Sequence, residues 1–506
     1  MSKPAMPIND PREIRGWTMY DWANSAFSTT VVTVFLGPYL TSLAQGAADA
    51  AGMLYIGNVP IKFDSYFSYC ISASVLLQVT ILPILGALAD YSNMRKRLMM
   101  FFSSLGAIST IALFFLTPGL HWLGGLLFIL ANVSFGASIV FYNAYLPDIA
   151  SEDMRDSVSS RGFAMGYLGG GLLLLVNLAM YALMEDGALV ARLSLASAGF
   201  WWLGFSFVTF RALKDRHTPR DLPEGETYLS VGFTQLAKLI DTSSRTIAVL
   251  MSLPMLVPVL FFLQPILNLD IRLVLAPALG PIIVLVLFLS HKSKTLPEAM
   301  KYLVAYLLYN DGIQTVIAIT AIFASQELGM ESSQLILVIL MIQFVAFGGA
   351  HLFNFFASRI GTKRAIITSL VVWTIGTVYA YAGMKDKTIV IGESMTQAQL
   401  EFWILAFFLA LVLGGSQALS RSLFAQMIPD NQEAEFFSFY EVSERGTSWM
   451  GTFVFGIANQ ISGSMRVGIL SVIFFFFAGL LLLPMVNVPR AVEQGKAASV
   501  KLAAGD

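Results

Sequence analysis

The sequence contains few charged residues for its length. Only 12% of its 506 residues are Asp, Glu, Lys or Arg, about half the fraction usual in a soluble domain, whereas 56% are hydrophobic. Long apolar runs recur along the whole chain and leave no room for a sizeable water-soluble domain. The composition therefore predicts a protein that lies in the lipid bilayer. The formal net charge of −1 gives no sign of a polyanionic partner such as nucleic acid.

Several patterns that carry chemistry are also missing. The single cysteine, Cys70, excludes an intrachain disulfide and a multi-cysteine metal site. The sequence has no G-x-x-x-x-G-K-[ST] phosphate loop, no H-E-x-x-H metal pair and no G-x-S-x-G nucleophile elbow. We therefore expect no catalytic residues, cofactor or metal, and any energy must come from a gradient. The N-terminus is polar and leads directly into the first apolar run, so no secretory signal is expected.

Fourteen apolar segments have the length needed to cross a bilayer, about 20 residues for about 30 Å of hydrocarbon. They form a group of six, a central pair and a second group of six. The segments lie at 17–40, 66–89, 98–117, 122–145, 161–184, 191–213, 247–267, 271–290, 302–326, 333–357, 364–383, 400–424, 441–461 and 467–488. A re-entrant hairpin is the alternative for the central pair.

This grouping predicts four regions. They are an N-terminal six-helix bundle (1–213), a cytoplasmic linker (214–300), a C-terminal six-helix bundle (301–490) and a cytoplasmic tail (491–506). The linker contains the additional hairpin (247–290) and, over 230–245, an amphipathic helix that would lie on the membrane surface. With the N-terminus in the cytoplasm, 25 of the 31 Lys and Arg residues fall on the cytoplasmic side, as the positive-inside rule requires. Both termini are then cytoplasmic.

The two groups of six segments share sequence patterns. "GALADYSNMRKR" (86–97) follows the second segment, and "NFFASRIGTKRA" (354–365) follows the corresponding segment of the second group. Asp21-x-x-Asn24-Ser25 is matched by Asp311-x-x-Gln314-Thr315, and "LPD" (146–148) by "IPD" (428–430). Because both groups start on the cytoplasmic side, they are expected to be parallel repeats, an arrangement found in secondary transporters.

These motifs carry a family resemblance. "GALADYSNMRKR" resembles the loop between spans two and three of the major facilitator superfamily. "YDWANSAF" (20–27), "YNDGIQT" (309–315), "GTKRA" (361–365) and "GGSQALSRSLFAQMIP" (414–429) resemble its vacuolar amino-acid effluxer-like branch, which includes bacterial permeases. The resemblance implies an all-α polytopic fold of two six-helix bundles, a monomer, and a bacterial plasma membrane, or a vacuolar membrane in a eukaryote.

The resemblance also implies a charge latch at the cytoplasmic face. In the superfamily the Gly of this loop allows close helix packing, while the Asp and the basic residues open and close the latch; these roles would fall to Gly86, Asp90 and Arg95. The second copy has Ser358 in place of the Asp, so the latch is expected in the N-terminal half alone. Two further departures are the central pair and, in span eleven, Ser438 where the branch tends to have Gly.

Polar residues inside spans are the candidates for a site, because a carboxylate there costs about 2.5–3.5 kcal/mol on insertion scales. The candidates for substrate or ion binding are Asp21, Asn24, Asn143, Asp311, Gln314, Gln343, Gln417 and Arg421. Asp21 is either a structural anchor paired with a neighbouring helix or a group that contacts substrate or protons. Asp311 lies near mid-membrane, where a buried carboxyl is suited to carry a proton. We expect both carboxylates to face a shared cavity.

Glu441, Glu444 and Arg445 are expected to open the eleventh span. Glu441 shares a helix face with the other two, which predicts either a local ion pair at the membrane surface or a gating charge between the halves. Asn143, Gln343 and Gln417 have interhelical hydrogen bonding as their alternative role. His351 is a weaker candidate for a proton relay, and the glycines of the fifth span indicate close helix packing.

The sequence thus favours a secondary transporter that moves a small polar solute by alternating access. Amino acids or related metabolites are the expected solutes, with proton coupling through Asp311 as a hypothesis. A permease for peptides, sugars or cell-wall fragments is the alternative within the same fold. A membrane-embedded enzyme or a receptor is the remote alternative.

Overall fold

The computed structural model describes residues 8–56, 59–92, 94–214, 227, 230, 234, 280–385, 390–391, 395–445 and 449–504. Eleven helical stretches among these residues are long and apolar enough to cross a membrane. The predicted all-α polytopic architecture is confirmed. The predicted amphipathic helix at 230–245 and most of the predicted hairpin at 247–290 lie outside the described residues.

The N-terminal bundle contains six membrane crossings. The first crossing consists of α1 (Pro11–Ala26), a π-helical segment η1 (Phe27–Phe35) and α2 (Leu36–Ala47). The others are α3 (Tyr66–Tyr91), α4 (Arg95–Ala112), α5 (His121–Ala144) with the short α6 (Leu146–Ile149), α7 (Arg155–Leu183) and α8 (Gly187–Ala212). The antiparallel strands β1 (Met53–Ile56) and β2 (Val59–Lys62) connect α2 to α3.

The C-terminal bundle follows α13 (Gly280–Lys292). It contains α14 (Pro297–Leu328), α15 (Ser332–Ile360), α16 (Thr362–Ala382), α17 (Gln397–Ala425), α18 (Glu433–Arg445), α19 (Trp449–Ser462), α20 (Met465–Ser471) and α21 (Ile473–Met485). The short strands β3 (Val390–Ile391) and β4 (Met395–Thr396) pair between α16 and α17. Helix α22 (Val488–Ala504) ends the described chain.

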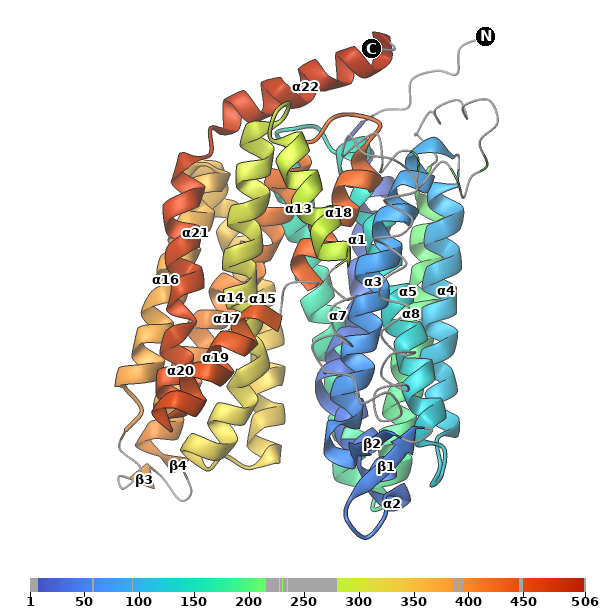
Figure 1. Cartoon of the computed structure of the whole chain (residues 1–506), viewed down its shortest axis with the longest axis vertical. Helices are drawn as coiled ribbons and strands as arrows, with labels where there is room; N and C mark the ends of the chain where they lie inside the picture. Colours follow the sequence, from blue (N-terminus) through green and yellow to red (C-terminus); the bar gives the residue numbers. More distant parts are fainter. Residues whose placement is uncertain are drawn as a thin grey trace.

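The two bundles stand side by side (Figure 1). Helix α22 lies across the end that carries the basic clusters, which is the cytoplasmic end, and both strand pairs lie at the opposite end. The bundles touch mainly where α18 meets α3 and where α15 and α17 meet α7. These contacts position the residues that form the site described below.

Local sequence explains where the first helix begins and how it packs. Asp10 caps α1 by accepting the backbone N–H of Arg12 at 2.9 Å, and Pro11 occupies the first turn, where its missing N–H costs nothing. The Lys214 ammonium hydrogen bonds with Asp10 at 2.8 Å and lowers the pKa of that carboxyl.

The glycines of the fifth span pack α7 against α1. A Cβ at Gly166 would stand 2.6 Å from the Ser25 hydroxyl, and one at Gly169 would stand 2.6 Å from the Trp22 carbonyl. Only residues without side chains allow the two backbones to approach this closely. The expectation of close packing at these glycines agrees with the structure.

One predicted helix boundary differs from the structure. Helix α18 begins at Glu433, well before the predicted start at 441, because its early acidic residues are buried against partners rather than exposed to water. Most of the predicted tail is helix α22, whose Gly495 lies against the Met427 carbonyl and whose Ser499 hydroxyl accepts the backbone N–H of Asp430.

Candidate functional site

A cavity of about 570 Å³ lies between the two bundles and is lined by side chains from both. Ten of the predicted substrate-binding and gating residues line its wall: Asp21, Asn24, Asn143, Gln314, Gln343, Gln417, Arg421, Glu441, Glu444 and Arg445. Asp311 and the three latch residues, Gly86, Asp90 and Arg95, do not. The wall continues to Leu335 and Phe402, near the outer ends of α15 and α17. The cavity therefore extends from mid-membrane towards the outer side.

Arg421 crosses from α17 into the N-terminal bundle at the floor of this cavity. Its Nη1 and Nη2 donate to Asp21 Oδ2 at 3.3 and 3.2 Å, and Nη1 also donates to Asn143 Oδ1 at 3.2 Å. Its Nε and Nη2 donate to the hydroxyl and the carbonyl of Ser159, both at 3.0 Å. These bonds engage all five guanidinium N–H groups, and the residue is only 3% exposed. Arg421 therefore ties the two bundles together.

Aromatic rings, a tyrosine hydroxyl and a glycine surround the Arg421–Asp21 ion pair. The guanidinium lies 4.3 Å from the centre of the Phe163 ring and 4.8 Å from that of Trp17, in cation–π contact. The Tyr142 hydroxyl donates to Asp21 Oδ2 at 2.7 Å. A Cβ at Gly162 would stand 2.5 Å from the same oxygen, so a glycine leaves the space that the pair occupies. The pairing with Arg421 is the geometry expected of a structural anchor, and Asp21 also lines the cavity.

A second charged group stands on α18. Glu441 accepts hydrogen bonds from Asn143 Nδ2 at 3.0 Å and from Arg445 Nε at 3.1 Å. Glu444 accepts one from the Tyr306 hydroxyl at 2.8 Å, and no cation of the described chain pairs with it. The predicted ion pair between Glu441 and Arg445 is present, but these residues lie in the second half of α18, in the cavity wall, rather than at the start of a span.

Neutral polar groups line the remaining wall. The Asn24 amide nitrogen is buried and has no hydrogen-bond partner among the described residues. The adjoining π-helical segment η1 presents Ser28 and Thr33 to the cavity, and the Thr33 hydroxyl donates to the Ser28 carbonyl at 2.8 Å. π-Helical turns are frequent at functional sites. Gln343 of α15 lines the same cavity from the C-terminal bundle.

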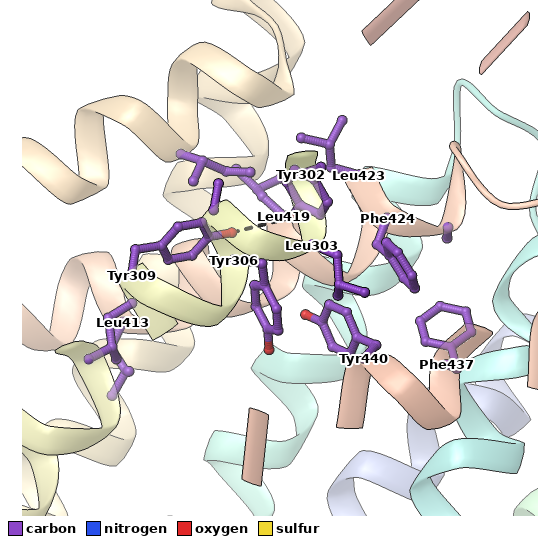
Figure 2. Packing of buried hydrophobic residues seen from close by; sticks show 14 of the residues in the cluster. Tyr302, Leu303, Tyr306, Tyr309, Leu413, Leu419, Leu423, Phe424, Phe437 and Tyr440 are labelled. Carbon is purple, nitrogen blue, oxygen red and sulfur yellow. Dashed lines mark hydrogen bonds between the residues drawn. The ribbon is translucent and has the colours of Figure 1, made fainter. Parts of the chain in front are cut away.

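A cluster of tyrosines lies where the C-terminal bundle borders the cavity. Figure 2 shows Tyr302, Tyr306 and Tyr309 along α14, with Tyr440 of α18 beside Tyr306. The rings of Tyr306 and Tyr440 stack with centroids 4.2 Å apart. The Tyr309 hydroxyl hydrogen bonds with the hydroxyl of Ser420, the residue that precedes Arg421, at 2.6 Å. This cluster fixes α18 and α17 against α14.

Asp311 does not face the cavity. It lies five residues after Tyr306, which is about 140° around an α-helix, and it is 1% exposed inside the C-terminal bundle beside Gly451 of α19. The expectation that both acidic residues turn into a shared cavity is therefore wrong for Asp311. The repeat fixes residue spacing, but it does not fix how each helix is rotated in its bundle.

The cytoplasmic latch joins the two bundles. Arg95 Nη2 contacts Asp90 at 2.8 Å and Glu433 of α18 at 3.0 Å, while Nη1 contacts Asp148 at 2.9 Å. Asp90 also accepts the backbone N–H of Glu435 at 2.8 Å, so its charge lies at the positive end of the α18 dipole. The charged motif lies in the N-terminal half, and the C-terminal half supplies its partners, Glu433 and the start of α18.

Gly86 lies where α3 and α18 meet. A Cβ at this position would stand 2.8 Å from Ser438 Cβ and 2.5 Å from the Ala434 carbonyl. In the corresponding motif of the second half, Lys363 bonds within its own bundle, where its Nζ donates to the carbonyls of Pro484 and Val486. The cavity is therefore closed at its cytoplasmic end by α3, α18 and the Arg421 pair.

Sequence reasoning missed three contributors to this closure. Glu433 was not singled out, and Asp156 of α7 accepts hydrogen bonds from Ser422 and Thr362 of the other bundle. Tyr167 of α7 donates to Gln417 at 2.6 Å. Glu433 and Asp156 lie outside the predicted spans, where a charged residue cannot be told from an ordinary loop residue. The repeated "LPD" motif, which contains the Arg95 partner Asp148, was the one sequence signal that pointed to charged contacts at this end. His351 is exposed against Phe347, away from the cavity wall.

The sequence matches one family over most of its length. A profile of the family described as "Vacuole effluxer Atg22 like" matches residues 9–253 and 283–496. The chain is 29% identical to the uncharacterized MFS-type transporter YxiO of Bacillus subtilis, over 94% of this chain and 95% of that protein. It is 23% identical to autophagy-related protein 22-1 of Penicillium rubens, over 99% of this chain and 95% of that protein.

Solved structures share the fold at low sequence identity. The proton:xylose symporter XylE superposes with a TM-score of 0.62 at 13% identity, covering 94% of this chain and 95% of that one. The human organic anion transporter MFSD10 superposes with a TM-score of 0.60 at 14% identity, covering 94% of this chain and all of that one. These matches establish the major facilitator fold and say nothing of the solute.

Proposed function

The chain belongs to the Atg22-like vacuole effluxer family, and we propose that this multi-pass membrane transporter moves small solutes that carry a cationic amine. Amino acids and related metabolites are the solutes that fit this description. The observation that carries the proposal is the charge of the cavity wall. Asp21 is paired with Arg421 and Glu441 with Arg445, which leaves Glu444 as the acid without a cationic partner among the described residues.

An ammonium group is the ligand that Glu444 suits best. A carboxylate in a partly enclosed, low-dielectric wall attracts a cation more strongly than it would in water. The Tyr306 hydroxyl, already bonded to Glu444, fixes the direction of the carboxylate. A solute ammonium would supply the missing counter-charge.

The opposite end of an amino acid would meet weaker groups. Arg421 has no free N–H for a solute carboxylate, because all five are engaged. The unpartnered amide nitrogen of Asn24 and the amides of Gln314 and Gln343 are neutral donors in the wall, and Arg445 is already paired with Glu441. The amine should therefore govern affinity more than the carboxylate does. The volume of about 570 Å³ lies within the range of small-molecule sites.

Closure at the cytoplasmic end supports alternating access. The Arg421–Asp21 pair, the latch and the α3–α18 contact close the cavity at its cytoplasmic end, whereas its wall extends towards the outer side. This corresponds to an outward-facing state. Release to the cytoplasmic side requires these contacts to separate while the outer ends approach.

Solute counterflow in proteoliposomes tests this proposal. We expect exchange of amino acids, strongest for those with cationic side chains, and little exchange of acidic amino acids or sugars. Glu444→Gln should raise the half-saturating concentration about tenfold, the equivalent of 1.4 kcal/mol. Glu493→Gln, at an exposed position of α22, is the matched control and should change nothing. Saturable exchange of sugars, or an unchanged half-saturation in Glu444→Gln, would contradict the proposal.

A further inference from the structure

A second polar site lies inside the C-terminal bundle, away from the solute cavity. Asp311 and Thr315 stand one turn apart on α14 and are 1% and 0% exposed. Neither carboxylate oxygen nor the hydroxyl has a hydrogen-bond partner among the described residues. Both side chains face Gly451 of α19, where a Cβ would collide with the Thr315 hydroxyl and touch the carboxylate.

Two helices that pack on α14 beside this site provide no counter-charge. Helices α19 and α21, which pack on α14, contain no ionisable residue along their described lengths. A Cβ at Gly312 would stand 3.0 Å from the Phe476 ring of α21, so the neighbouring wall is aromatic.

The charged groups of α18 and the nearest phenol of α14 are engaged elsewhere. Glu441 and Arg445 pair with each other, and Glu444 bonds to Tyr306. The Tyr309 hydroxyl bonds to Ser420. Residues 446–448, outside the described chain, are Gly, Thr and Ser and bring no charge.

An ionised carboxylate in such a place is strongly disfavoured. Burial removes its hydration, and no cation of the described residues lies beside it; the backbone N–H of Gly451 is close to the carboxylate without meeting hydrogen-bond geometry. The neutral acid avoids most of this penalty. Asp311 therefore holds a proton in the outward-facing conformation and gives it up only when water or a donor reaches it.

We propose that Asp311, with Thr315 and the Gly451 backbone beside it, is the proton-carrying site that couples solute movement to a proton gradient. This rests on the transport function proposed above. Helix α19 covers the acid and follows α18 in the chain; α18 carries Glu444 in the cavity and Glu433 in the latch. A shift of α18 and α19 that opens the latch would also uncover Asp311. The proton then leaves the carboxylate oxygen towards the cytoplasmic side, and no covalent bond other than O–H is made or broken.

The neutral mimic Asp311→Asn separates exchange from coupling. In proteoliposomes it should keep solute counterflow within about twofold of the wild type, because the amide resembles the protonated acid. Accumulation driven by a pH gradient should fall to the level seen without a gradient. Asp64→Asn, an exposed acid outside the spans, is the control and should preserve both activities.

The outcomes distinguish this inference from the proposed function. Wild-type protein that exchanges no amine solute contradicts the proposed function, and the coupling site falls with it. Wild-type protein that exchanges solute but ignores a pH gradient, or accumulates solute on a sodium gradient alone, overturns the coupling site only. So does accumulation by Asp311→Asn at the wild-type level.

Thr315→Val provides a second variant in case Asp311→Asn does not fold. It removes the hydroxyl beside the acid while keeping the shape of the side chain. Counterflow should persist, and the external pH at which driven uptake is half-maximal should shift. An unchanged pH profile in a folded Thr315→Val protein counts against the site.

Discussion

Arg421 uses every donor of its guanidinium on the other bundle, and this single side chain explains much of the cytoplasmic closure. The residues of the pair were visible in the sequence as charges inside spans one and ten. Their pairing was not, because 400 positions separate Asp21 from Arg421 and a single sequence does not say which faces meet. For the same reason the sequence did not reveal the hydrogen bond from the Tyr142 hydroxyl to Asp21, because Tyr142 resembles any other aromatic residue of a membrane helix.

Arg421→Lys should loosen this closure although it keeps the charge. Lysine has three donors on a flexible stem and cannot reproduce the planar fork that reaches Asp21, Asn143 and Ser159 together. We expect a loss of about 1–3 kcal/mol from buried groups left without partners. Thermal unfolding in detergent measures it. Arg364→Lys, an exposed residue without a described partner, is the control. Equal melting temperatures for both variants would show that Arg421 does not clamp the bundles.

Helix α18 contributes to both the latch and the cavity wall. Its first turn meets Asp90 and Arg95, and its last turn carries Glu441 and Glu444. Hydropathy placed its start too late because four acidic residues lower the apolar character of this stretch. Buried and partnered charges of this kind cannot be told from surface charges in one sequence. Helix α14 shows a second limit of single-sequence prediction. Residue spacing placed Asp311 at the correct depth in this helix, but it did not show that the helix is rotated so that Asp311 points away from the cavity.

Gly86→Ala should separate α3 from α18. A methyl group has no space there, because it would meet the Ala434 carbonyl and Ser438. Spin labels at Arg97 and Arg364, exposed on the two bundles, should report a longer distance across the cytoplasmic end. Gly204→Ala, on α8 in open space, is the matched control. A distance distribution identical in both variants would mean that this contact does not hold the cytoplasmic end closed.

At the scale of the whole molecule, composition and apolar length predicted a multi-pass membrane protein, and the family resemblance supplied the fold of two six-helix bundles. Apolar length predicted fourteen crossings, and eleven helical stretches of the described residues are long and apolar enough to be crossings; the Lys and Arg distribution predicts their direction. The strand pairs at the outer end, the closure of one side and the cavity itself depend on packing between distant helices. The central hairpin at 247–290 stays a prediction, since its residues lie mostly outside the described chain.

Thiol labelling from one side of the membrane tests the central claim most directly, that a cavity between the bundles opens outward and holds the solute. The native Cys70 is buried and is replaced by Ala before new cysteines are introduced. In sealed vesicles with the outer face exposed, Ser28→Cys, at a half-buried position of the cavity wall, should react with an impermeant reagent, and saturating amine solute should protect it. Asp311→Cys, inside the C-terminal bundle, should stay unlabelled. No labelling of Ser28→Cys in the absence of solute, or equal labelling of both positions, would contradict the account.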